Sequence, residues 1–186
     1  DTVEKVLKAH NYYFIKKSVK CVEKKLLEHD YNISFSGSTC LLLFILRDQL
    51  LCANIGDSRC VLFKCSLDDK WCYVNLSLVH KPSDKGELKR ILDSGGDVHK
   101  YVDKNGNTDD NIDRIWVKGK LYPGLSLSRS IGDLVGKKIG IISEPTFVAK
   151  KIDKRSKFII LASDGFWDVM EPKIIVDVLR PFLYTL

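Results

Sequence analysis

The sequence has no long apolar run, which excludes a helix that crosses a membrane. Its longest purely apolar run extends from Leu41 to Leu46 and is closed by Arg47 and Asp48, far short of the roughly 20 residues that a transmembrane helix needs. The chain also opens on Asp1, without an initiator methionine and without the basic-then-apolar pattern of a signal peptide. We therefore expect no membrane association, and we interpret the N-terminus as an internal cut.

Cysteine and histidine are present, but none of their spacings is typical of a zinc site. The six cysteines include no Cys-x-x-Cys pair, and the four histidines include no His-x-x-x-His pair. The cysteines lie in apolar or strand-like stretches, which favours buried, reduced thiols over metal ligands. This pattern indicates a reducing intracellular compartment, the cytoplasm or the nucleus, and we interpret each histidine as a solvated or core residue.

The basic residues do not gather into one surface. The net charge is +6, but the lysine pairs are spread among acids, and no aromatic platform or nucleic-acid motif accompanies them. We therefore expect no nucleic-acid partner. With 45% hydrophobic and 29% charged residues, the composition is typical of a globular protein, and the length favours one domain over residues 1–186.

Apolar spacing predicts helices and strands along the whole chain. Steps of three and four residues from Val3 to Glu28 predict an amphipathic helix, with these inward positions: Val3, Val6, Leu7, Phe14, Val19, Val22 and Leu26. Three runs separated by turn residues, 39–46, 50–55 and 60–64, predict an antiparallel meander, and 71–78 is a candidate fourth strand.

The second half of the chain repeats this alternation. Ser83-Asp84 followed by Glu87 predicts a capped helix that stops at Gly95-Gly96. The polar stretch 103–111 predicts a mobile surface loop, 147–152 and 157–161 predict two strands, and 173–179 predicts a helix after Pro172. Helices alternating with strands on short connections predict an α+β layered architecture with antiparallel sheets.

Five segments carry a resemblance to a known family. They are Ser36-Gly37-Ser38-Thr39; Ala53-Asn54-Ile55-Gly56-Asp57-Ser58-Arg59; His80-Lys81-Pro82 with Glu87, Arg90 and Ser94-Gly95-Gly96; Leu127-Ser128-Arg129-Ser130-Ile131-Gly132-Asp133; and Leu161-Ala162-Ser163-Asp164-Gly165-Phe166-Trp167-Asp168-Val169-Met170. Each alone is weak, because Gly-Asp and Asp-Gly are common turn dipeptides. In this order and spacing they resemble the protein phosphatase 2C family. The resemblance implies a β-sandwich of two antiparallel sheets flanked by helices, here incomplete.

The last segment suggests metal chemistry. The apolar run 158–161 is expected to deliver Asp164 to the rim of a buried strand, and Asp168 follows one helical turn later. Two close carboxylates suit a hard cation such as Mg²⁺ or Mn²⁺. From the local residues alone, a helix-capping Asp164 with a solvated Asp168 is the favoured interpretation. The resemblance favours metal ligands at both positions.

The resemblance also implies an activity and a substrate. In the family, two metal ions activate a water that attacks the phosphorus of phosphoserine or phosphothreonine in a protein. Residues near Asn105 and from Arg114 to Gly124 occupy the place of the family's variable flap. We therefore expect substrate contacts from Arg114, Trp116, Lys118 and Lys120.

The sequence departs from the family pattern in three places. The family's phosphate-binding Arg and Asp-Gly-His-Gly ligands would precede this chain, and its Asp-Asn segment would follow Leu186. Val79 stands where the family usually has Asp, so a third metal site is not expected. We predict weak or no metal binding and little activity for this chain alone. The alternative function is that of a catalytically inactive regulatory or binding domain. Because the missing segments would leave strand edges open, we expect a dimer or a partner chain to cover the truncated surface.

Overall fold

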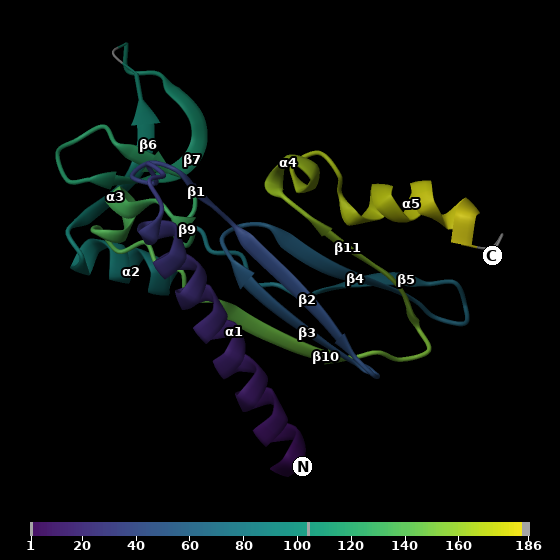
Figure 1. Ribbon diagram of the computed structural model, residues 1–186. Helices are drawn as coiled ribbons and strands as arrows, with labels where there is room; N and C mark the ends of the chain where they lie inside the picture. The colour runs from purple at the N-terminus through teal and green to yellow at the C-terminus, as the bar shows by residue number, and fades with distance from the viewer. Residues whose placement is uncertain (1, 104, 184–186) are drawn as a thin grey trace.

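The computed structural model describes residues 2–103 and 105–183 and consists of a β-sandwich and a smaller α/β subdomain (Figure 1). One sheet has the order β10-β3-β2 and the other β11-β4-β5, and all the pairings are antiparallel. The strands are β2 (Cys40–Leu46), β3 (Gln49–Ile55), β4 (Arg59–Cys65), β5 (Trp71–Asn75), β10 (Thr146–Lys151) and β11 (Ser156–Ala162). The predicted fold class is confirmed.

Apolar side chains from both sheets form the centre of the sandwich. Leu50 and Cys52 of β3 pack in one buried cluster with Cys60 and Leu62 of β4, and each side chain is at most 2% exposed. Strand β3 is buried along almost its whole length, since a helix covers its other face. Burial on both faces explains the near-continuous apolar sequence of these two strands.

Helices cover the two outer faces of the sandwich. Helix α1 (Thr2–Glu28) packs Ile15 against Leu51 and Ala53 of β3. On the opposite side, α4 (Asp164–Trp167) and α5 (Pro172–Leu183) pack Trp167 and Ile175 against β4. Figure 1 shows α1 and α5 on opposite sides of the two sheets, so the order of layers is helix, sheet, sheet, helix.

The subdomain is formed by the segment between the two halves of the sandwich. It contains α2 (Lys85–Asp93), the sheet of β6 (Gly96–Val102), β7 (Thr108–Val117) and β8 (Pro123–Leu125), and α3 (Leu134–Lys137). Its core is a cluster of isoleucines: Ile91, Ile115, Ile139 and Ile141. A short ladder of β1 (Gly37–Ser38) with β9 (Ile131–Gly132) joins the start of the chain to this region.

Of the predicted three-stranded meander, the pairing of the first strand with the second is confirmed, but the pairing of the second with the third is wrong. Strands β2 and β3 pair through a turn at Arg47, which adopts a φ of 56°. Strand β4 does not continue that sheet but pairs with β5 and β11 in the facing one. Two strands that are apolar on both faces bury more surface by facing each other across the core than by lying edge to edge.

Two other predictions from local pattern are corrected. On α1, Phe14 and Val22 were expected to face inward but are 49% and 46% exposed. Val19 is buried as expected, and Ile15, which was not among the expected positions, is buried as well. Strand β7 begins inside the predicted loop, and Asp103 closes the preceding turn by accepting hydrogen bonds from the amides of Asn105 and Asn107 at 2.8 and 2.9 Å. Position 104, within that predicted loop, lies outside the described residues.

The cysteines are reduced, but not all of them are buried. The described chain contains no disulfide, and Cys52, Cys60 and Cys65 are buried as expected. Cys21 and Cys72 are exposed, because they lie on the outer side of α1 and on the edge strand β5. Among the described helices, none has the length and apolar character needed to span a bilayer.

Candidate functional site

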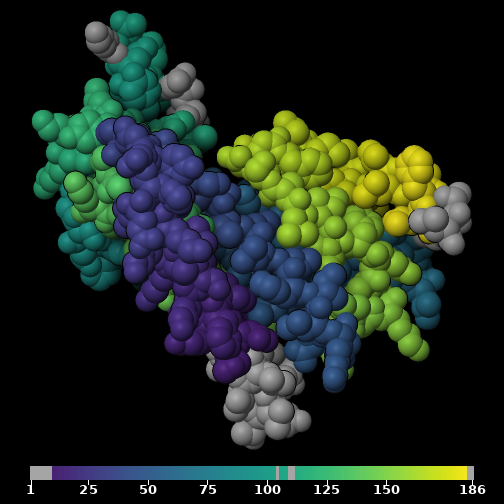
Figure 2. All heavy atoms as spheres, in the orientation of Figure 1, coloured from purple at the N-terminus to yellow at the C-terminus, as the bar shows by residue number. Residues whose placement is uncertain are grey.

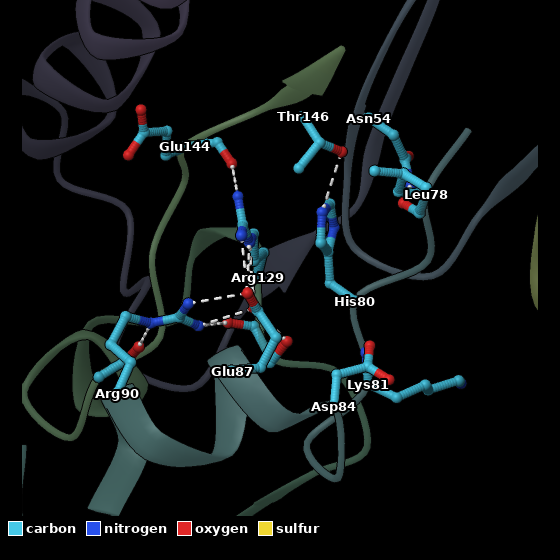
Figure 3. Close-up of polar contacts among 12 residues, drawn as sticks. Asn54, Leu78, His80, Lys81, Asp84, Glu87, Arg90, Arg129, Glu144 and Thr146 are labelled. Carbon is cyan, nitrogen blue, oxygen red and sulfur yellow. Dashed lines mark hydrogen bonds and ion pairs between the residues drawn. The ribbon is translucent and has the colours of Figure 1, made fainter. Parts of the chain in front are cut away.

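The third and fourth motif segments meet at one buried carboxylate, that of Glu87 in α2 (Figure 3). Arg90 donates to its two oxygens from Nη1 and Nη2 at 2.9 and 2.8 Å. Arg129 donates from Nη2 to Oε1 at 2.6 Å and from Nε to Oε2 at 3.0 Å, and the Ser128 hydroxyl donates to Oε2 at 2.6 Å. Both oxygens are therefore saturated with donors.

The charge of Glu87 is stabilised in spite of its burial. Burial by itself raises the pKa of the carboxyl group, but hydrogen bonds from Arg129, Arg90 and Ser128 outweigh it and hold this pKa far below its usual range. The two guanidinium groups also reach main-chain oxygens, Arg90 that of Gly140 at 2.7 Å and Arg129 that of Glu144 at 2.6 Å. The network thus ties α2 to the segments on either side of α3.

His80 joins this network to the sandwich. Its Nδ1 lies 3.1 Å from the amide nitrogen and 3.0 Å from the carbonyl oxygen of Gly56, and its Nε2 lies 3.0 Å from the Thr146 hydroxyl. Burial, and next the positive charge of Arg129, lower its pKa from 6.5 to about 4. His80 is therefore neutral at pH 7 and links β3 to the start of β10.

Close backbone contacts hold the remaining motif residues. At Gly37, a Cβ would lie 2.1 Å from Oδ2 of the buried Asp133 side chain, so only glycine fits there. The Thr39 hydroxyl lies 2.8 Å from that of Ser58, and Lys81 donates to the buried Asp57 carboxylate at 2.7 Å. These contacts, together with the pairing of Gly37 with Gly132, give the turn residues of these motifs a structural role.

The fifth segment attaches to the same assembly through a tryptophan. Trp167 Nε1 donates to the carbonyl oxygens of Arg59 and Ala162 at 3.2 and 3.1 Å, and Ala162 is also the strand partner of Arg59. The Arg59 Nε atom is buried without a hydrogen-bond partner among the described residues. All five segments are therefore brought together by the fold.

Asp164 and Asp168 lie at the beginning of α4 and directly after it. Both are exposed, and the amide of Asp168 donates to the Asp164 main-chain oxygen at 2.8 Å, which confirms that one helical turn separates them. One Asp164 carboxylate oxygen accepts from the Gly165 amide at 2.8 Å. In the space-filling view, a notch separates the subdomain from the segment that begins with α4 (Figure 2).

The strand before Asp164 differs from the prediction. We expected a buried strand, but β11 stands at the edge of its sheet and Leu161 is 43% exposed. It pairs with β4 on one side, and within the described residues no strand pairs with its other side. The two acids therefore lie near the open edge of the sheet.

The four expected flap residues fall into two groups. Lys118 and Lys120 lie exposed in the turn after β7. Arg114 is partly buried and donates to the Gly124 carbonyl oxygen at 3.1 Å. Trp116 is 4% exposed, donates to the His99 carbonyl oxygen at 2.9 Å and stacks on the His99 ring, so it supports the hairpin and offers no surface to a substrate.

Sequence reasoning missed the central role of Glu87 and His80. Glu87 was interpreted as a first-turn acid of a helix, although Arg90 at i+3 was a visible signal for an ion pair. The long-range partner Arg129 lies 42 residues away, and no local pattern links the two. His80 was expected to be solvated or core and is buried, but the sequence did not predict its contacts with Gly56 and Thr146.

Comparison with known proteins agrees with the five motifs. The family model for protein phosphatase 2C matches residues 2–184. Probable protein phosphatase 2C 12 of Oryza sativa subsp. japonica is 35% identical over 82% of this chain and 38% of its own length. Probable protein phosphatase 2C 18 of Arabidopsis thaliana is 36% identical over 87% of this chain and 31% of its own length. The chain therefore spans about a third of these relatives.

Solved structures share the fold. The crystal structure of serine-threonine phosphatase 2C from Toxoplasma gondii superposes with a TM-score of 0.80 at 22% identity, over 97% of this chain and 58% of that one. A C. elegans sex determining protein superposes with a TM-score of 0.70 at 22% identity, over 90% of this chain and 37% of that one. The family model supports the same assignment over nearly the whole chain, and so this chain belongs to the protein phosphatase 2C family.

Proposed function

We propose that this chain is part of a metal-dependent protein serine/threonine phosphatase and supplies two carboxylates, Asp164 and Asp168, to its metal centre. The observation that carries the proposal is the position of α4. This helix follows β11 directly, is tied to the motif network through Trp167, and has the two acids at its start and just past its end. Membership of a family that generally depends on Mg²⁺ or Mn²⁺ supports the choice of cofactor.

The two acids suit such a cation as part of a larger ligand set. Mg²⁺ and Mn²⁺ prefer oxygen ligands, and Mg²⁺ keeps several waters beside one or two carboxylates. Across residues 2–103 and 105–183, no three or more His, Cys, Asp or Glu side chains are grouped to hold a metal ion. We therefore propose that the 186-residue chain alone binds the ion weakly and hydrolyses phosphopeptides slowly or not at all.

The metal ions, the two aspartates and the basic residues in and after β7 would each have a separate role in the proposed reaction. A bound pair of metal ions would supply an acidified water as the nucleophile for phosphorus. Asp164 and Asp168 would hold and orient the cation from one side. The exposed Lys118 and Lys120 carry the positive charge that suits a phosphoprotein substrate, and the partly buried Arg114 would support them.

Mn²⁺ binding followed by electron paramagnetic resonance tests the assignment. The chain should bind Mn²⁺ with a dissociation constant above about 0.1 mM, and Asp164→Asn or Asp168→Asn should abolish this binding. Asp177→Asn removes an exposed acid of α5 and should leave it unchanged. Binding that survives both site substitutions would show that the ligands lie elsewhere.

Hydrolysis of a phosphothreonine peptide tests the activity. The full-length protein should turn over in the presence of Mn²⁺ and should lose activity with Asp164→Asn. The 186-residue chain alone should hydrolyse the peptide slowly or not at all. A turnover rate of about 1 s⁻¹ or faster would contradict this expectation.

A second function, a phosphatase-like binding domain without catalysis, is favoured by Val79. This half-buried aliphatic residue stands beside His80, where the family resemblance implies an acid, and it cannot bind a cation. If the full-length protein binds the phosphothreonine peptide but never hydrolyses it at saturating Mn²⁺, this second function replaces the first.

A further inference from the structure

A groove runs between α1 and the segment that contains β9 and α3. Figure 2 shows the surface of α1 (purple) beside this green segment. The groove has two pockets, one of about 400 Å³ and one of about 260 Å³, and Lys137 lines both. Lys137 forms an ion pair with Glu23 of α1 at 2.8 Å, and this pair separates the two pockets. None of these residues belongs to the proposed metal site.

The larger pocket carries one positive charge in excess. Lys16, Lys20 and Lys137 line it, together with Glu144 as the one acid. Lys16 is paired with Glu144, and Lys137 with Glu23. In the described part of the chain, Lys20 has no ion-pair partner within contact distance, although the Glu144 charge lies close enough to influence it. The pocket therefore has the charge to accept a single carboxylate.

The smaller pocket is apolar. Leu26, Leu27, Ile33 and Leu134 form most of its wall. Leu27 is 60% exposed, which leaves aliphatic surface for a ligand to cover. A pocket of this size suits one branched aliphatic side chain, because burying a leucine-sized group is favourable in proportion to the apolar area removed from water.

The spacing between the pockets specifies the ligand further. On α1, the two residues that line the larger pocket, Lys16 and Lys20, are centred about 13 Å along the helix axis from Leu26 and Leu27, which line the smaller pocket, at about 1.5 Å per residue. Four residues of an extended chain, at about 3.3 Å each, cover the same distance. Positions i and i+4 of a strand project their side chains from the same face, so one short extended segment can occupy both pockets.

We propose that this groove docks an extended peptide segment with an acidic residue at i and a leucine-sized aliphatic residue at i+4. The carboxylate lies in the larger pocket between Lys16 and Lys20, where Lys20 supplies the unpaired positive charge. The aliphatic side chain fills the smaller pocket, and the Lys137–Glu23 pair lies beneath the residues between them. The docking surface is independent of the phosphatase assignment, since it uses none of the residues proposed for metal binding or catalysis.

Nuclear magnetic resonance titration with a defined peptide tests the proposal. The probe is acetyl-Thr-Glu-Thr-Ser-Thr-Leu-Thr-amide, added to the ¹⁵N-labelled protein. We expect amide shifts confined to residues 16–33 and 132–145 and a dissociation constant of about 0.1–1 mM, as two small contacts allow. A peptide with Gln in place of Glu, and one with Leu moved to i+3, should each bind about fivefold more weakly.

Protein variants provide matched controls. Lys20→Glu and Leu27→Ser alter the two pockets, and each should weaken binding about fivefold or more. Lys17→Glu makes the same charge change on an exposed position of α1 that lines neither pocket and should leave binding within about twofold. The proposal is wrong if no shifts appear at millimolar peptide, if shifts lie outside the groove, or if Lys17→Glu and Lys20→Glu have equal effects.

Discussion

Replacing Glu87 by glutamine should destabilise the protein by about 3 kcal/mol, because breaking one partner of a buried ion pair leaves charge unpaired. The side chain of Glu87 is 9% exposed, and those of Arg129 and Arg90 are 14% and 24% exposed. Glutamine keeps the shape and one acceptor oxygen, but its NH₂ group would face the guanidinium donors. Since the two arginines retain some access to water, we place the cost at the lower end of the range for fully buried pairs.

Urea unfolding at pH 7, followed by tryptophan fluorescence, measures this cost. With an m-value of about 2 kcal/mol/M, the midpoint should fall by about 1.5 M. The ordinary pKa of the carboxyl group is 4.5 and the folded one is lower, so the stabilisation is fully present above pH 4.5 and is lost as the pH falls through the folded value. Measurement at pH 7 therefore captures all of it.

A surface glutamate and a double variant provide the controls. Glu28 is 58% exposed and lies 3.7 Å from Lys24 on α1, so Glu28→Gln should cost less than about 0.5 kcal/mol. The double variant Glu87→Gln/Arg129→Gln should cost less than the sum of its single changes, by about 1 kcal/mol or more. The reasoning fails if Glu87→Gln shifts the midpoint no more than Glu28→Gln, or if the two changes are additive.

Two further predictions concern the same assembly. Because the pKa of His80 is about 4 in the folded protein and 6.5 ordinarily, the unfolded chain binds more protons between these values, and stability should fall by about 3 kcal/mol as the pH drops from 6.5 to 4. His80→Gln should remove this part of the pH dependence, and His29→Gln should not, as pH-dependent urea unfolding would reveal. Gly37→Ala should cost about 2 kcal/mol or more of stability, since its Cβ would lie 2.1 Å from the Asp133 carboxylate. Gly86→Ala in α2 is the control, because nothing lies within 4 Å of the added Cβ. In thermal unfolding this control should be neutral or slightly stabilising. Equal melting temperatures for the two alanine variants would contradict the steric argument.

The sequence alone determined the family and many of the helices and strands, but not β6 to β9. Turn residues such as Gly56 and runs such as 50–55 define strands locally, because side-chain periodicity and backbone preference act over a few residues. The five motifs were sufficient to identify the family, and the one-turn spacing of Asp164 and Asp168 followed from helix geometry. The metal-binding role of these two acids stays a prediction.

Only the tertiary structure decided which segments meet. Strands β3 and β4 are joined by a short turn, but they lie in facing sheets, since burial of two-faced apolar strands depends on the whole core and not on their connection. Glu87 and Arg129 meet across 42 residues, and Trp116 is buried against His99 rather than exposed to a substrate. Such contacts depend on the packing of distant segments, which local periodicity does not encode.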